Sequence, residues 1–165
     1  MTPAVMTRLN EFADRLSALT DRPSNRTVGL LLGLPSATVV GLAAWLTPAT
    51  QGFGTHMQLG LGGCAMLTMT GWPCPMCGMT TTFALMAHFR PLDAFVNQPF
   101  GVVLFSLTLL TALLGIADMV TGRGVIRQAF RWVGRREQLL AVGLLVGMIG
   151  GWIYKCIRMH PSLLS

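Results

Sequence analysis

A chain of 165 residues in which 52% are hydrophobic and only 11% are charged does not have the composition of a soluble domain. The apolar residues are concentrated in three long stretches, which makes lipid the expected environment. The formal charge of +6 comes mostly from arginines beside those stretches, and the few aromatic residues are not interleaved with them, which argues against nucleic-acid binding.

The first 26 residues show the three- and four-residue spacing of apolar side chains that is typical of an amphipathic helix. Charged residues lie between the apolar positions, and Pro23 is a natural end for such a helix. The apolar positions are Met6, Leu9, Phe12, Ala13, Leu16 and Leu19. We therefore expect residues 1–26 to form a cytoplasmic helix on the membrane surface or against a partner.

Residues 28–46 contain no charged side chain and form the first expected membrane span. At about 1.5 Å per residue, a segment of this length crosses most of a hydrocarbon core of about 30 Å. The second expected span is residues 100–120, where Asp118 in the last turn opposes the helix dipole. We expect Asp118 to pair with Arg123 or Arg127, or to reach the water among the lipid headgroups.

The third expected span, residues 139–154, is short and is flanked by Trp152 and Lys155 at the interface. Small residues recur at every fourth position in the first and third spans, which lets another helix approach closely. The glycines concerned are Gly29, Gly33, Gly41, Gly143, Gly147 and Gly151. We expect these two spans to be neighbours, and their glycines to offer a contact to a membrane-protein partner or a second copy of the chain.

Positive charge is distributed unevenly along the chain. The loop 121–138 holds five arginines and the first 26 residues hold four, whereas residues 47–89 hold no lysine or arginine. By the positive-inside rule, the N-terminus and the 121–138 loop are expected to be cytoplasmic, and residues 47–98 extracytoplasmic. A basic surface helix is expected in the loop, with apolar side chains on one face and arginines on another: Ile126, Phe130, Val133, Arg123, Arg127 and Arg131.

Residues 57–98 are apolar but are interrupted by glycine and proline, and each piece is too short to cross a bilayer alone. We expect a re-entrant or interfacial helical hairpin packed on the three spans, with the string GWPCPMCG at its bend. One or two additional crossings are the alternative. The expected fold is all-α, with a membrane domain over residues 27–156 and a C-terminal tail over residues 157–165.

The bend carries Cys74 and Cys77 in the string Cys-Pro-Met-Cys-Gly. Two cysteines at this spacing can form a disulfide or bind one metal ion. Gly78 frees the backbone for a tight bend before the helix that follows. Because Cys77 lies close to the start of that helix, we expect the helix dipole to lower the pKa of its thiol.

Three separate strings of residues in this region resemble a known family. They are Thr70-Gly71-Trp72-Pro73-Cys74-Pro75-Met76-Cys77-Gly78-Met79-Thr80, Arg90-Pro91-Leu92-Asp93-Ala94 and Gln98-Pro99-Phe100-Gly101. Over residues 55–120 the chain resembles domain-of-unknown-function family 2752, small bacterial membrane proteins with a T-G-x-P-C-P-x-C-G-x-T-R signature. Thr81 stands where many members have arginine. The resemblance implies a bacterial inner-membrane protein and no particular reaction.

Three functions are consistent with these residues. The pattern favours a noncatalytic membrane subunit in which the cysteine turn is structural, because it contains no hydrolase triad, phosphate loop or carboxylate pair. The second is a zinc-binding module in which Cys64, Cys74 and Cys77 combine with His88 or His56. The third is an extracytoplasmic thiol–disulfide redox protein with Cys74 and Cys77 as its reactive pair. Zinc is the one cofactor that these residues suggest.

Overall fold

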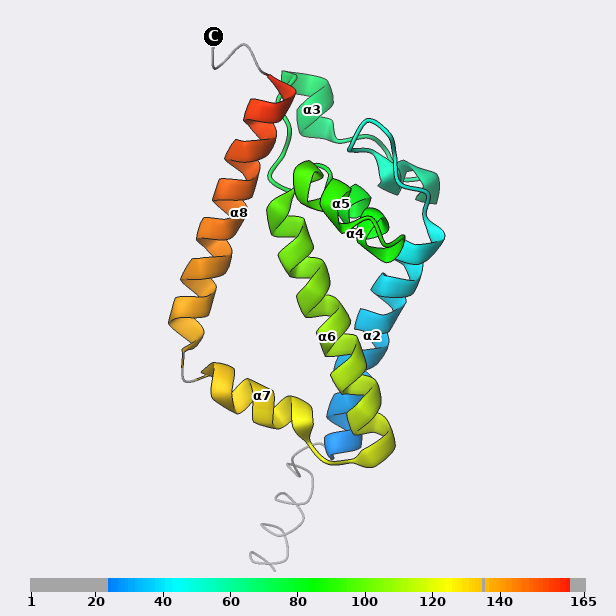
Figure 1. Ribbon diagram of the computed structural model, residues 1–165, viewed down its shortest axis with the longest axis vertical. Helices are drawn as coiled ribbons and strands as arrows, with labels where there is room; N and C mark the ends of the chain where they lie inside the picture. The colour runs from blue at the N-terminus through cyan, green and yellow to red at the C-terminus, as the bar shows by residue number, and fades with distance from the viewer. Residues whose placement is uncertain (1–23, 135, 161–165) are drawn as a thin grey trace, which may run out of the picture.

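The computed structural model describes residues 24–134 and 136–160, and every element in them is a helix (Figure 1). Residues 1–23 of the expected N-terminal amphipathic helix and residues 161–165 of the expected C-terminal tail lie outside the described residues. The long helices are α2 (Asn25–Trp45), α6 (Pro99–Thr121) and α8 (Glu137–Met159). The shorter ones are η1 (Thr55–Leu59), α3 (Ala65–Thr70), α4 (Met79–Ala87), α5 (Pro91–Asn97) and α7 (Val125–Gly134).

The three long helices confirm the expected all-α membrane fold. Helices α2, α6 and α8 contain 21, 23 and 23 residues, with mean hydropathies of 1.8, 2.3 and 1.8. At about 1.5 Å per residue each is long enough to cross a core of about 30 Å. Large apolar side chains such as Leu31 and Val146 are more than half exposed on their outer faces, as lipid-facing side chains are. Within the described residues no further helix has the length and hydropathy of a span.

Helices α2 and α6 pack along each other through glycine. A methyl group added at Gly33 would lie 2.8 Å from the Cα atom of Gly115, and one added at Gly29 would lie 2.7 Å from the Gly115 carbonyl oxygen. Side chains at these positions would force the two backbones apart. The glycine stripe of the first span therefore contacts the second span, and the expectation that it contacts the third is wrong.

Helix α8 packs on α6 by a different contact. Its Gly147 and Gly151 accommodate the ring and Cβ of Phe100, with added methyl groups at 2.9 Å from that side chain in both cases. The sequence suggested that the glycines of α8 contact another stripe of small residues. Instead, the Phe100 ring of α6 fills the space beside them. Gly41 and Gly143 have no heavy atom within 4 Å of an added methyl group. They are the two stripe glycines that remain open on the described surface.

Helix α7 lies across the end of the bundle opposite to α3 and connects α6 to α8 (Figure 1). Asp118, which is 1% exposed, accepts hydrogen bonds from the backbone N–H groups of Val125 and Ile126, both at 2.8 Å. A carboxylate at a helix N-terminus satisfies donors that have no partner within the helix and is favoured by the helix dipole. Asp118 therefore caps the following helix through its backbone N–H groups, a role that was not expected beside an arginine partner or headgroup water.

The cysteine-bearing region forms four short helices beside the other end of the long ones (Figure 1). Helices α4 and α5 form a hairpin that packs on α6, and α4 also contacts α2 and η1. The connection after α2 is held by Gln58, whose side-chain Nε2 donates to Thr47 O at 2.6 Å, and by the buried Thr55 and Thr81 hydroxyls, 2.8 Å apart. This hairpin bends at residues 88–90, between α4 and α5, whereas the expected one was to bend at the string GWPCPMCG, between α3 and α4. The expected hairpin and its re-entrant or interfacial placement stay predictions.

The close α2–α6 crossing predicts a large difference between two glycines of the same helix. Gly33→Val should lower the free energy of unfolding by about 1–3 kcal/mol, because the added methyl groups overlap the Gly115 backbone. Gly41→Val is the matched control, since its site is open. Thermal unfolding of both variants in detergent micelles measures the difference. Equal thermal unfolding midpoints for the two variants would contradict the close contact between α2 and α6.

Candidate functional site

The Cys74–Cys77 segment forms two successive turns that lead into α4. The Cys77 N–H donates to Cys74 O at 2.9 Å, and the Met79 N–H donates to Met76 O at 3.1 Å. Gly78 has a φ of +86° and precedes the first residue of α4. A methyl group added there would lie 2.7 Å from Gly52 O and 3.0 Å from the Lys155 Nζ atom. Glycine is therefore required by both the backbone angle and the close approach of other segments.

Three side chains from α8 and from the α5–α6 junction donate hydrogen bonds to carbonyl groups of this turn or of the residues beside it. The Trp152 indole Nε1–H of α8 donates to Pro73 O at 2.8 Å. Gln98, between α5 and α6, donates from Nε2 to Pro75 O at 3.3 Å. Asn97 donates from Nδ2 to Gly78 O at 3.1 Å. The turn is therefore held through its backbone carbonyls by residues from both sides of it, and the sulfur atoms take no part in these bonds.

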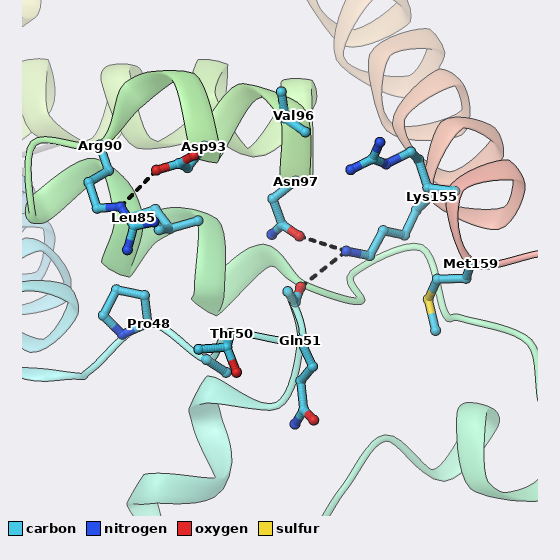
Figure 2. A pocket seen from close by; sticks show the side chains of 13 residues that line it. Pro48, Thr50, Gln51, Leu85, Arg90, Asp93, Val96, Asn97, Lys155 and Met159 are labelled. Atoms are coloured by element: carbon cyan, nitrogen blue, oxygen red, sulfur yellow. Dashed lines mark hydrogen bonds and ion pairs between the residues drawn. The ribbon is translucent and has the colours of Figure 1, made fainter.

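Lys155 is the residue whose role sequence reasoning missed. Expected as an anchor at the membrane interface, it is 5% exposed and donates from Nζ to Gly52 O at 3.0 Å and to Asn97 Oδ1 at 2.8 Å (Figure 2). A buried ammonium is costly unless such bonds replace its hydration. One signal was available: Lys155 follows Gly151 by four residues, so it lies on the α8 face that contacts α6.

The three cysteines of the expected zinc site line one cavity of about 470 Å³, together with His56. His88 is not among the lining residues of that cavity, and its Nδ1 atom lies 2.8 Å from Ala84 O. The cysteines concerned are Cys64, Cys74 and Cys77. All four cysteines of the chain are free thiols, and no three His, Cys, Asp or Glu side chains of the described residues are grouped closely enough to hold a metal ion. Zinc binding stays a prediction.

Burial decides the ionisation of the thiols in the turn. Burial raises the pKa of Cys77 to about 11, and neighbouring Cys74 and Cys64 add to the effect while Lys155 opposes it. Burial likewise raises the pKa of Cys74, whereas the backbone N–H of Leu67 lowers the pKa of Cys64. The expectation that the helix dipole lowers the pKa of Cys77 is wrong. Removing the thiolate from water is unfavourable, and this effect is larger than any stabilisation of the thiolate by the helix N-terminus.

Comparisons with curated proteins and with solved structures give no match to this chain. A comparison with protein families gives a match to part of the chain. It covers the cysteines of the cavity, the α4–α5 hairpin and the first half of α6, a shorter stretch than the 55–120 of the resemblance. Residues 64–112 match the family described as "Protein of unknown function (DUF2752)", which is the family that the sequence resemblance indicated.

Proposed function

We propose that this protein is a noncatalytic membrane subunit in which residues 71–78 form a structural joint between α8 and the α5–α6 junction. The observation that carries the proposal is the set of three hydrogen bonds from Trp152, Gln98 and Asn97 to carbonyl oxygens of that segment. A buried carbonyl oxygen without a hydrogen-bond donor is unfavourable, and so is a buried N–H group without an acceptor. These bonds therefore satisfy both the turn and the side chains that contact it. The prolines and glycine of the motif give the turn the shape that aims its carbonyls at these donors.

The state of the thiols supports the same role. A thiol reacts as the thiolate, and a pKa of about 11 leaves Cys77 protonated at neutral pH. Cys77 is also only 5% exposed, so a redox partner has little access to its sulfur atom. A protonated and buried cysteine packs as a small apolar side chain. These properties favour packing over the expected redox pair.

Zinc binding is the second candidate, because Cys64, Cys74, Cys77 and His56 line one cavity. Three sulfur ligands and one imidazole are a common tetrahedral set. The candidate requires the four side chains to move together around the ion. It also requires Cys74 and Cys77 to lose their protons, which a bound cation would promote.

A count of thiols and metal separates the candidates. The structural joint predicts four free thiols per chain in the denatured protein, both before and after reduction, and no bound zinc. Thiol titration and metal analysis should be made on the same purified sample. Zinc near one equivalent per chain would favour the zinc module. Two thiols that appear only after reduction would favour the redox pair.

The raised pKa of Cys77 predicts its alkylation profile. In the unmodified chain, where Cys64 and Cys74 help to raise the pKa of Cys77, the alkylation rate of Cys77 with iodoacetamide should keep rising toward about pH 11. The rate at Cys64, followed on its own peptide in the same sample, should level off at lower pH, because an N–H group stabilises its thiolate. The rates are measured by mass spectrometry. A Cys77 rate that is flat above neutral pH would show a stabilised thiolate and count against the proposal.

The indole bond to the turn predicts a stability difference between two tryptophans. Trp152→Phe removes the donor to Pro73 O and should lower the free energy of unfolding by about 1–2 kcal/mol. Trp132→Phe is the matched control, because Trp132 is 72% exposed on α7. Thermal unfolding followed by circular dichroism measures both. If the two variants unfold at the same temperature, α8 is not held through this carbonyl.

A further inference from the structure

A second cavity, of about 390 Å³, lies between the loop after α2, helix α5 and the C-terminal end of α8 (Figure 2). Four charged side chains line it, and all belong to α8 or to the start of α5: Arg90, Asp93, Lys155 and Arg158. Cysteines do not contribute to its wall. Cavities of roughly 300–1,000 Å³ are of the size that binds small molecules or their head groups.

The charges of this cavity do not balance. Arg90 and Asp93 form an ion pair with Nε and Oδ2 2.7 Å apart, so each neutralises the other. Lys155 and Arg158 then leave two positive charges on the wall, and no second carboxylate lines the cavity. Of the three N–H donors of an ammonium, Lys155 directs two to the uncharged oxygens of Gly52 and Asn97. Within the described residues it has no carboxylate partner.

We propose that this cavity binds a phosphate group, carried either by the headgroup of an anionic phospholipid or by a soluble phosphate. A phosphate offers several acceptor oxygens and one or two negative charges, which match an ammonium donor and a guanidinium fork. The location fits, because Lys155 and Arg158 lie in the last turns of a helix long enough to cross a membrane, where lipid phosphates are found. This inference concerns a separate cavity and does not rest on the structural role of the cysteine turn.

The mixed character of the wall suits a phosphate that is attached to a larger molecule. Asn97 and Gln51 supply amide groups, while Leu85, Val96 and Met159 supply apolar surface. The cavity is larger than the volume of a bare phosphate, which leaves space for an ester group such as glycerol. Arg158 is exposed and Lys155 is buried, so an incoming phosphate would meet the guanidinium first and the ammonium at the inner wall.

Binding can be measured on the full-length protein in neutral detergent with two probes. Inorganic phosphate is titrated at constant ionic strength while the thermal midpoint is followed, and phosphatidylglycerol retention is counted by native mass spectrometry. We expect saturable binding of at least one probe. Arg158→Gln should weaken it roughly tenfold, because one charged donor is lost. Arg136→Gln is the matched control, since this exposed arginine precedes the opposite end of α8. It should bind as the unmodified chain does.

Each result decides the proposal. Saturation by inorganic phosphate alone identifies a soluble phosphate as the ligand. Retention of phosphatidylglycerol alone identifies a lipid headgroup. Either result supports the site. Lys155→Met should also abolish binding, and if that variant does not fold, Arg158→Gln decides alone. The proposal is overturned if neither probe saturates, or if Arg158→Gln and Arg136→Gln bind equally well.

Discussion

The buried ammonium of Lys155 is the constraint on which this end of the molecule depends. Its hydrogen bonds to Gly52 O and Asn97 Oδ1 join α8, the loop after α2 and the end of α5. Because a buried charge without such partners is strongly unfavourable, the three segments are held at fixed positions around it. A methyl group on Gly78 would lie 2.7 Å from Gly52 O, the carbonyl that accepts a hydrogen bond from Lys155 Nζ. The glycine that ends the cysteine motif is thus explained by its positive φ and by the loop carbonyl to which Lys155 is bound.

The same packing sets the chemistry of the cysteines. The turn that brings Gly78 beside Lys155 also buries Cys77 at the start of α4. A positive charge and a helix start both favour a thiolate, but the loss of water around the sulfur outweighs them and raises the pKa. Sequence spacing identified the position of Cys77 correctly, yet spacing carries no information about how many atoms cover the sulfur. The expected direction of its pKa was wrong for that reason.

Hydropathy was sufficient to locate the three spans, since long apolar segments with at most one charged residue have few alternatives to lipid. It was not sufficient to pair them. Gly29 and Gly33 were correctly taken as interface positions, but their partner Gly115 is separated from Gly101, the other glycine of α6, by 14 positions, so no four-residue repeat marks it. Asp118 was recognised as unusual, but its partners are backbone amides, which have no sequence signature. Lys155 appeared ordinary beside an apolar segment, although its spacing from Gly151 places it on the packed face.

The three spans are held by unequal means. Helices α2 and α6 meet backbone to backbone, whereas α8 meets α6 where Gly147 and Gly151 accommodate Phe100. The polar bonds that attach α8 come from three residues of a single helical turn: Trp152 to Pro73 O, Tyr154 to Val96 O and Lys155 to Gly52 O and Asn97 Oδ1. The cavity that we assign to a phosphate lies at this attachment, and two of its cations belong to α8. A ligand bound there would contact α5 and α8 together. It would therefore stabilise α8, the least buried of the three spans, where α8 is joined to the rest of the protein.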